Sequence, residues 1–476
     1  MVQAIFATAF EVILDRHLDA AAPAEIGLWS LRGLEVIEPA LRPELRAGTL
    51  LLSGPERPIA ARPIPPGVPG ADAAGPLAVA VAALFDAAWR ASPRLRRAGP
   101  ERILQSAFEE LFNHLDPYSR YLATQEAVAA RARRIGQTGL GLRLAAAGRG
   151  NAVVLAEVVP GGPAERAGLR VGDRVLAVDG IPVSAAALST AAALLEGPAD
   201  TEVALRIGRG ARRFEVLLAR SAVAPDLVRA ERAEDILWLR VEGFSNDTDR
   251  KLAGALAAGL AAGPVRGVVL DLRGNRGGLL AQAVAVASAF LDAGVVAQTA
   301  GRHPDAARLY LAGGGGLAAG LPLVVLIDGR SASAAEIVAA ALSDRGRAVA
   351  VGSATMGKGL IQVVVPLPNG AELLVTWSRV LAPLGWPIQG LGVLPAVCTS
   401  LGAEATAEAL ARLRQGEASP MAPVLARLRA ARAPVPASEI AALRGTCPPA
   451  EGREADLVAA RALIEAPRAY AAALPR

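Results

Sequence analysis

Between Ile236 and about residue 381, short apolar runs alternate with helical stretches, and this pattern constrains the fold more than any other feature. The runs are "ILWLRVEGF", "VRGVVLDLRG", "LPLVVLIDG", "RAVAVGS" and "AELLVTWSRVL". Strands that consist almost entirely of apolar residues are buried on both faces, as in a sheet that helices cover. The pattern therefore predicts an α/β layer with a largely buried sheet.

The segment before this layer has a different periodicity. From about residue 136, short β-like runs with glycine turns appear: "TGLGLRL", "NAVVLAEVVPGGPA", "DRVLAVDGIPV" and "TEVALRIGRGARRFEVLLA". Such runs indicate a small β-rich domain. The predicted division of the 476-residue chain is a helical N-terminal region over 1–135 with a Pro/Gly-rich linker near 53–76, the β-rich domain over 136–222, the α/β domain over 223–400, and a helical extension over 401–476.

Composition excludes several classes of protein. Apolar residues make up 53% of the chain and charged residues 20%, which suits folded domains and not a disordered chain. The net charge is only +5, aromatic residues are 4%, and no polybasic run is present, so nucleic acid is not an expected partner. No apolar run of 18 residues lacks charges, so no membrane span is expected.

The start of the chain and the cysteines bear on the compartment. The start, "MVQAIFATAFEVILDRHLDAA", has no basic region and reaches Glu11 and Asp15 early, so it is predicted as an amphipathic helix and not as a signal peptide. Cys398 and Cys447 lack metal-ligand spacing; they form either one disulfide or two buried thiols. With three histidines in the chain, a zinc site has few candidate ligands, and no metal or organic cofactor is expected.

Lysine is rare in this chain, which draws attention to Lys358 in "ATMGKGL". The chain has 48 arginines but only two lysines, the other being Lys251. A desolvated lysine can lose its proton and act as a base, whereas arginine cannot. Apolar neighbours would lower the pKa of Lys358, and the amide of Gln362 could hold the amine without an anion's tendency to keep it protonated. The alternative is that Lys358 is an ordinary surface charge.

A serine nucleophile could work with this lysine. In "VVLIDGRSASAAEIVAAALSD" a strand is expected to end at Asp328 and Glu336 to open a helix, so Ser331 and Ser333 lie at a helix N-terminus. A serine there is either an N-cap or a nucleophile whose oxyanion would meet backbone N–H groups. Because neither this segment nor the lysine motif contains a histidine, Lys358 is the candidate base.

Two glycine motifs, "GLGLRL" and "AGLRVGDRVLAVDG", resemble those of a PDZ domain. The backbone N–H groups of Gly139, Leu140, Gly141 and Leu142 can turn toward a carboxylate, and the strand that follows can pair with an extended peptide. The resemblance implies that this domain recognises the C-terminus of a polypeptide.

The whole set of motifs resembles the carboxyl-terminal processing proteases, which are tail-specific serine peptidases with a Ser/Lys dyad. After "LDPYSRYL" and the PDZ motifs come "DLRGNRGG", "SASAAE", "GKGLIQ" and "IQGLGVLP", in the family's order. The resemblance implies that Ser333 is the nucleophile, Lys358 the general base and Gln362 the residue that orients the lysine. It also implies an oxyanion hole made by the backbone N–H groups of Gly278 and Ala334.

The same resemblance implies a multi-domain α+β fold in which the PDZ domain precedes an α/β, crotonase-like catalytic core, between helical N- and C-terminal regions. It implies a serine endopeptidase that acts on polypeptides, with an adaptor or activator protein and a second copy of the chain as candidate partners. It also implies a periplasmic or otherwise exported location. Glu336 and Asp344, eight residues apart on one helix, are interpreted as structural.

Two other functions are weighed against the peptidase. A PDZ scaffold with a degenerate protease fold would bind C-terminal tails without cutting them, but it would be expected to lack Ser333, Lys358 or Gln362, and all three are present. A crotonase-like acyl-transfer or CoA enzyme would use similar oxyanion chemistry. The PDZ motifs and the lack of an evident adenine-nucleotide site argue against it.

Overall fold

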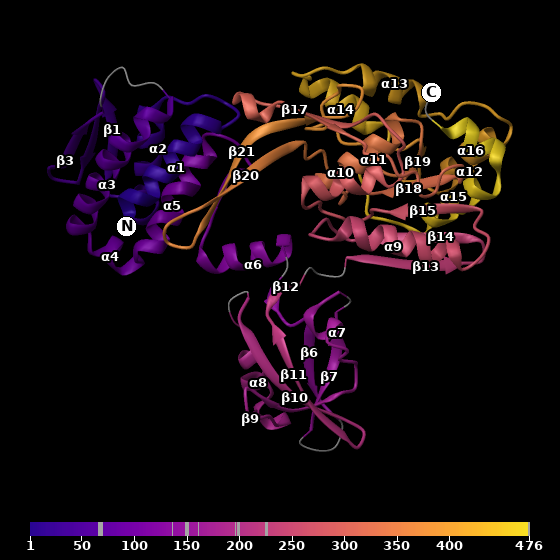
Figure 1. Ribbon diagram of the computed structural model, residues 1–476. Helices are drawn as coiled ribbons and strands as arrows, with labels where there is room; N and C mark the ends of the chain where they lie inside the picture. The colour runs from indigo at the N-terminus through magenta and orange to yellow at the C-terminus, as the bar shows by residue number, and fades with distance from the viewer. Residues whose placement is uncertain are drawn as a thin grey trace.

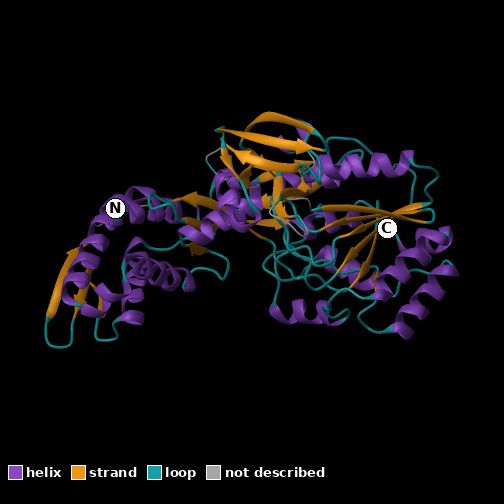
Figure 2. Cartoon of the chain, turned by 90° about the horizontal axis from the view of Figure 1, so that it is seen from below, coloured by secondary structure: helices purple, strands orange, loops and turns teal. Residues whose placement is uncertain are grey.

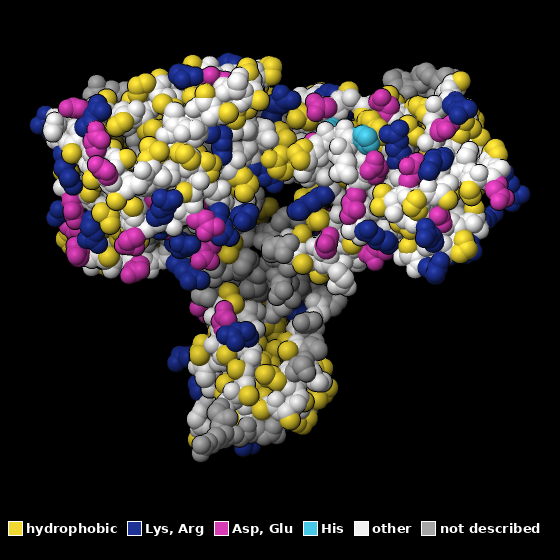
Figure 3. Space-filling model, turned by 180° about the vertical axis from the view of Figure 1, so that it is seen from behind, with side chains coloured by type: hydrophobic (Ala, Val, Ile, Leu, Met, Phe, Trp, Pro, Cys, Tyr) yellow, Lys and Arg dark blue, Asp and Glu magenta, His cyan; other side chains and the backbone are white. Residues whose placement is uncertain are grey.

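The computed structural model describes residues 1–64, 70–135, 137–147, 152–159, 161–195, 197, 200–223 and 227–474. Figure 1 shows a helical N-terminal region, a small β-rich region, and a larger region in which helices surround a sheet. The protein is thus a mixed α and β protein, as the sequence predicts. On the face drawn in Figure 3, basic and acidic side chains are interspersed and do not form one large patch.

Helices form most of the N-terminal region. The helix predicted at the start is confirmed as α1 (Val2–Arg16), in which Phe6, Phe10 and Ile13 recur at helical spacing and are buried. The other elements are α2 (Pro23–Ile37), η1 (Gly70–Ala73), α3 (Ala74–Ala91), α4 (Pro93–Ala98), α5 (Pro100–Asn113) and α6 (Thr124–Ile135). By length and composition alone the segment Gly70–Ala91 could cross a membrane, but 50% of its most apolar window is buried inside the protein.

The stretch predicted as a linker near 53–76 contains a strand, which corrects that prediction. β3 (Pro58–Pro63) pairs antiparallel with β2 (Thr49–Ser53), which in turn pairs with β1 (Arg42–Arg46). β3 lies at the edge of this sheet, where proline is tolerated because its missing N–H need not break a ladder hydrogen bond. Residues 65–69 of the stretch lie outside the described residues.

The β-rich region has its own apolar core and a sheet with strand order β11-β10-β8-β7-β6. Its elements are β6 (Leu142–Ala146), β7 (Val153–Val158), α7 (Pro163–Arg166), β8 (Arg174–Val178), β9 (Ile181–Pro182), η2 (Ala185–Ala187), α8 (Leu188–Leu195), β10 (Glu202–Arg209) and β11 (Arg212–Ala219). β5 (Gln137–Gly139) pairs antiparallel with β12 (Ser221–Val223). The chain therefore enters and leaves this region through a two-stranded neck.

The predicted buried sheet is present, with strand order β13-β14-β15-β18-β19-β22. Its strands are β13 (Val228–Ala233), β14 (Ile236–Val241), β15 (Gly267–Asp271), β18 (Leu323–Ile327), β19 (Val349–Gly352) and β22 (Val397–Cys398). From β14 onward the strands are parallel and follow one another in order. Right-handed crossovers then put α9 (Thr248–Ala261), α10 (Leu280–Ser288) and α11 (Ala334–Asp344) on one face.

A second sheet links the N-terminal region to the region built on the parallel sheet. Its order is β17-β16-β21-β20, with β4 (Arg120–Leu122) pairing with β21. The strands are β16 (Val295–Ala300), β17 (Arg308–Leu311), β20 (Leu360–Pro366) and β21 (Glu372–Leu381), and η3 (Pro304–Ala306) joins β16 to β17. Figures 1 and 2 show the molecule extended along this link, and the far end of the β20–β21 hairpin is buried in the N-terminal core through Leu367 and Leu373.

The C-terminal extension is helical, as predicted, and covers the second face of the parallel sheet. Its helices are α12 (Ala403–Arg414), α13 (Ala422–Ala430), α14 (Ala437–Gly445), α15 (Glu454–Glu465) and α16 (Pro467–Ala473), and α15 packs on β18 and β19. Cys398 in β22 and Cys447 after α14 form a disulfide, which is one of the two alternatives left open by the sequence.

Candidate active site

Three loops leave the same edge of the parallel sheet. β15, β18 and β19 are neighbours and run parallel, so their carboxyl ends lie side by side. Ligands of open parallel sheets bind outside this edge. Gly278 follows β15, Ser333 follows β18 and Lys358 follows β19. The topology therefore brings three of the predicted site residues to one edge.

The backbone of Ser333 is strained. Its φ of 56° and ψ of −115° lie outside the regions that residues with a side chain ordinarily adopt. Such conformations persist only where the surrounding structure holds them, and they cluster at active sites. Ser333 occupies the N-cap position of α11, yet its side chain makes no capping hydrogen bond within the described residues. The Ser333 hydroxyl is therefore not engaged in capping the helix.

Ser331, the other candidate serine, has a structural role. Its side chain is fully buried. Its hydroxyl donates to the carbonyl oxygen of Leu272 at 2.8 Å and accepts from the backbone N–H of Asp328 at 3.0 Å. These bonds join the loop after β18 to the loop after β15.

Two glycines bring the loop after β15 against Ser333. A Cβ on Gly277 would lie 2.8 Å from the Cβ of Ser333, and Gly277 and Gly278 have φ values of 98° and 146°. The side chain of Asn275 holds this loop by accepting from the N–H of Gly277 at 2.8 Å. Among the hydrogen bonds of the described residues, none uses the N–H of Gly278 or Ala334. Both groups can therefore donate to an oxyanion.

Glu336 links Ser333 to the lysine loop. Its carboxylate is fully buried, and its Oε2 accepts from the backbone N–H of Ser333 at 2.8 Å and of Lys358 at 2.9 Å. Its Oε1 accepts from the N–H of Gly357 at 2.7 Å and the hydroxyl of Thr355 at 2.5 Å. Burial raises the pKa of Glu336, and these four donors oppose that shift. One carboxylate thus holds both members of the expected dyad.

Burial and a neighbouring positive charge favour a neutral amine at Lys358. Burial lowers the pKa of Lys358, the positive charge of Arg120 lowers it further, and Glu336 opposes the shift. Its Nζ lies 5.4 Å from the centroid of the Tyr118 ring. No hydrogen bond or ion pair of Nζ is found among the residues that the structure describes. The amine is therefore available to a hydroxyl at the site.

Gln362 lies on β20, four residues after the lysine. Its Nε2 donates to the hydroxyl of Thr376 at 3.2 Å and to the carbonyl oxygen of Leu360 at 3.3 Å. Within the described residues no hydrogen bond joins it to Lys358. The structure places the glutamine on the strand that follows the lysine loop, and its orienting role stays a prediction.

The predicted tail-binding loop lies between β5 and β6, away from the dyad. Leu140 is buried, Gly141 has a φ of 67° and its carbonyl oxygen accepts from the N–H of Val159 at 2.8 Å. Gly139 ends β5 and Leu142 begins β6, which is the last strand in its sheet. An edge strand next to such a loop can pair with an added peptide strand.

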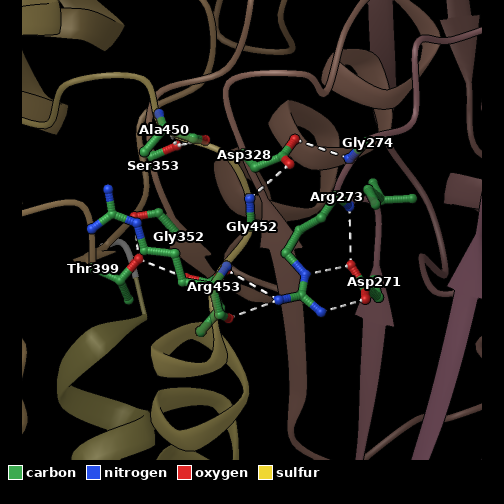
Figure 4. Close-up of polar contacts among 12 residues, drawn as sticks. Asp271, Arg273, Gly274, Asp328, Gly352, Ser353, Thr399, Ala450, Gly452 and Arg453 are labelled. Atoms are coloured by element: carbon green, nitrogen blue, oxygen red, sulfur yellow. Dashed lines mark hydrogen bonds and ion pairs between the residues drawn. The ribbon is translucent and has the colours of Figure 1, made fainter.

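A C-terminal strap, residues 447–456, runs against the three loops (Figure 4). The carbonyl oxygen of Ala450 accepts from the hydroxyl of Ser353, and the Ala450 N–H donates to the same hydroxyl, both at 3.0 Å. The N–H of Gly452 donates to Asp328 at 3.1 Å. The strap therefore binds the loops after β18 and β19 at once.

The strap also contacts the loop after β15. Arg273 pairs with Asp271 at 2.8 Å and with Asp456 at 3.1 Å, and it donates to the carbonyl oxygen of Arg453 at 2.9 Å. The hydroxyl of Thr399 donates to the other oxygen of Asp456 at 2.6 Å. Sequence reasoning assigned this segment to the helical extension and gave it no place near the site. Its only local signal was the Pro/Gly-rich "CPPAEGRE", which interrupts the helical pattern.

Comparison with known proteins identifies the family. Residues 235–398 match the model of peptidase family S41, and residues 154–209 match that of a PDZ domain. The carboxy-terminal-processing protease of Bartonella bacilliformis is 33% identical over 300 residues, which is 62% of this chain and 69% of that protein. The carboxyl-terminal-processing protease of Synechocystis sp. is 33% identical, over 61% and 69% of the two chains.

A solved structure, a photosystem II D1 C-terminal processing protease, is 31% identical, covers 69% of this chain and 90% of that chain, and has a TM-score of 0.38. The family and domain matches and the curated relatives agree with the order of domains along the chain. The protein is therefore a serine-type peptidase with a PDZ domain, and the chain belongs to peptidase family S41, the carboxy-terminal-processing proteases.

Proposed function

We propose that the protein is an endopeptidase in which Ser333 is the nucleophile and Lys358 the general base. The observation that carries this proposal is the single buried carboxylate of Glu336, which holds the backbones of both residues at 2.8 and 2.9 Å. Burial also lowers the pKa of Lys358, which increases the fraction of neutral amine at a given pH. Base-activated nucleophilic attack requires a neutral base that can take the proton of the serine hydroxyl.

In the proposed mechanism, Lys358 takes the hydroxyl proton of Ser333 while the serine Oγ bonds to the carbon of the scissile carbonyl. The N–H groups of Gly278 and Ala334 stabilise the resulting oxyanion, an assignment supported by the absence of other bonds from these two groups in the described residues. When the intermediate collapses, the peptide C–N bond breaks and the lysine gives its proton to the leaving amine. Water then attacks the acyl-enzyme and loses a proton to the same lysine. The ester C–O bond breaks, and the lysine returns the proton to the Oγ of Ser333.

We further propose that the C-terminal tail of a polypeptide substrate binds at Gly139, Leu140, Gly141 and Leu142 and pairs with β6. Two observations support this proposal: β6 is the last strand of its sheet, and the loop lies immediately before it. The relatives that bear the name carboxy-terminal-processing protease agree with it. An adaptor or activator protein and a second copy of the chain are the proposed partners.

Two finer proposals concern architecture and location. The ordered parallel strands with α9, α10 and α11 on one face support a crotonase-like catalytic core. A periplasmic or otherwise exported location is supported by the Cys398–Cys447 disulfide, since disulfides persist mainly in oxidising compartments.

A serine-reactive phosphonate tests the nucleophile. We expect the wild type to be labelled with one equivalent and Ser333→Ala to lose the label, as read by intact-mass spectrometry. Ser331→Ala is the matched control, because it removes a hydroxyl two residues away that has a structural role; it should keep the label while being less stable. Equal labelling of Ser333→Ala and wild type would refute the assignment. A protein that binds peptide tails and never takes the label would instead be a scaffold.

A further inference from the structure

Asp116 lies in the turn after α5, far in sequence from Ser333 and Lys358. Its carboxylate accepts a hydrogen bond from Thr376, and Thr376 in turn accepts one from Gln362. We propose that Asp116 is a positioning residue: through Thr376 it fixes which end of the Gln362 amide faces Lys358. The inference rests on the proposed Ser/Lys mechanism and deepens it. The peptidase family model matches only residues 235–398, so the inference adds residues of the N-terminal region to the site.

The Asp116 carboxylate is held on every side by hydrogen-bond donors. Its Oδ1 accepts from the backbone N–H groups of Tyr118 at 2.8 Å and Ser119 at 3.0 Å. Its Oδ2 pairs with the Nε2 of the buried His17 at 2.9 Å and accepts from the Ser119 hydroxyl. Burial by itself would raise the pKa of Asp116, but the hydrogen bonds from His17, Ser119 and Thr376 hold that pKa well below its ordinary value. The Asp116 carboxyl group is therefore ionised and can only accept hydrogen bonds.

Thr376 on β21 connects this anion to the glutamine. Its hydroxyl donates to Oδ1 of Asp116 at 2.8 Å, and its side chain is fully buried. Its backbone N–H donates to the Ser119 hydroxyl at 2.9 Å, so strand and turn are fixed to each other by two bonds. A hydroxyl has one hydrogen, and the Thr376 hydroxyl donates that hydrogen to Asp116. Toward Gln362 the Thr376 oxygen can only accept.

This polarity decides the orientation of the Gln362 amide, which bond geometry alone leaves ambiguous. The end that faces Thr376 at 3.2 Å must be the NH₂ group, and its second hydrogen goes to the carbonyl oxygen of Leu360 at 3.3 Å. The Oε1 of Gln362 is then the atom left for the lysine. A carbonyl oxygen accepts an N–H of the neutral amine and leaves the nitrogen lone pair for the hydroxyl of Ser333.

The same turn places a ring over the lysine. The backbone N–H of Tyr118 is bound to Asp116, and the Tyr118 ring centroid lies 5.4 Å from the Nζ of Lys358. An aromatic face at this distance attracts the ammonium form that arises during catalysis. The turn thus contacts the lysine directly and reaches the glutamine through Thr376.

Thr376→Val tests the inference, because valine keeps the shape and removes the hydroxyl. We expect kcat on an unfolded polypeptide to fall about tenfold, a fraction of the roughly 10²- to 10⁴-fold that a positioned base contributes, with KM unchanged. Thr376→Ser should restore kcat. Thr299→Val is the matched control: Thr299 is a buried threonine of β16 in the same sheet whose hydroxyl donates to Ala306, and its loss should leave kcat unchanged.

A double-mutant cycle separates positioning from general destabilisation. The cycle consists of Asp116→Ala, Thr376→Val and the double variant; alanine is used because asparagine would keep an oxygen that accepts from Thr376. The double variant should be no slower than Asp116→Ala alone, because without the carboxylate the Thr376 hydroxyl is no longer oriented. If the losses in kcat of the two single variants multiply in the double variant, Asp116 does not act through Thr376. The same conclusion follows if Thr376→Val keeps the wild-type kcat while Ser333→Ala is inactive. Either result would leave the assignment of Ser333 and Lys358 intact. An active Ser333→Ala enzyme would instead overturn the proposed function itself. If Thr376→Val does not fold, Thr376→Ala, which also lacks the hydroxyl, is compared with Thr376→Ser: a lower kcat for the alanine variant supports the inference, and equal kcat values overturn it.

Discussion

At the scale of single residues, the proposed mechanism requires a lysine whose proton can leave. Three effects act on the pKa of Lys358: burial and the charge of Arg120 lower it, and Glu336 raises it. A substitution of Glu336 would not test its effect on the pKa of Lys358 alone, because the same carboxylate holds the backbones of Ser333 and Lys358. Arg120 is exposed and makes no such structural bond among the described residues, so it offers the cleaner test.

We expect Arg120→Gln to move the pH dependence of catalysis to higher pH. The base must be neutral, so kcat/KM rises as pH rises through the pKa of Lys358, which lies below its ordinary value of 10.5. Removing a nearby positive charge raises that pKa, and activity at neutral pH falls. Full pH profiles of kcat/KM measure the shift. Arg94→Gln, at an exposed arginine of α4, is the control; equal profiles for the two variants would contradict the electrostatic account.

At the scale of elements, the C-terminal strap ties the loops of the site to one another. It contacts the loop after β15 through Arg273 and the loops after β18 and β19 through Asp328 and Ser353. The disulfide between Cys398 and Cys447 fixes the point where the strap begins. A segment that binds three loops at once should matter both for stability and for the geometry of the site.

We expect the double variant Cys398→Ser/Cys447→Ser to lose stability and to cut more slowly. The disulfide spans 49 residues, and the chain-entropy model gives about 4 kcal/mol for a loop of that length. The free energy of unfolding from chemical denaturation measures the loss, and kcat measured well below the unfolding temperature reports the loosened loops. Wild type treated with a reductant under mild denaturant should follow the variant. A variant with unchanged stability and kcat would contradict a role for the strap.

The elements also show what the sequence could reveal and what it could not. β15 and β18 were predictable because a buried parallel strand consists of a continuous run of apolar residues, here "GVVLD" and "LVVLI". β3 was missed because its prolines read as a linker, although an edge strand accepts them. Ser333 and Lys358 could be proposed from local motifs, whereas Thr376 and Asp116, 260 residues apart, meet through a contact that no local pattern encodes.

At the scale of the whole molecule, the β20–β21 hairpin joins the N-terminal region and the catalytic region into a single unit. Its far end packs into the N-terminal core, while its near end carries Gln362 and follows Lys358. The β-rich region is attached differently, through the β5–β12 neck alone among the paired strands described. The N-terminal region should therefore be required for a folded site, and the PDZ domain should be removable.

We expect a variant in which a short glycine-rich turn joins Gly139 to Ser221 to stay folded and to keep its phosphonate label. Gly139 and Ser221 face each other across the neck, so a turn between them preserves the β5–β12 pairing. The variant should no longer prefer substrates by their C-terminal residues, as measured with matched polypeptides that differ only in the tail. If it kept the wild-type preference on every substrate, tail capture by the PDZ domain would be wrong.

Cleavage of an unstructured polypeptide with an apolar C-terminus tests the central claim most directly. Wild type, Ser333→Ala and Lys358→Arg should be compared at equal concentration, with thermal unfolding recorded for each to show that all are folded. We expect wild type alone to cut, because arginine keeps the positive charge of Lys358 but cannot give up its proton. Full activity of Lys358→Arg would contradict the assignment of Lys358 as the general base.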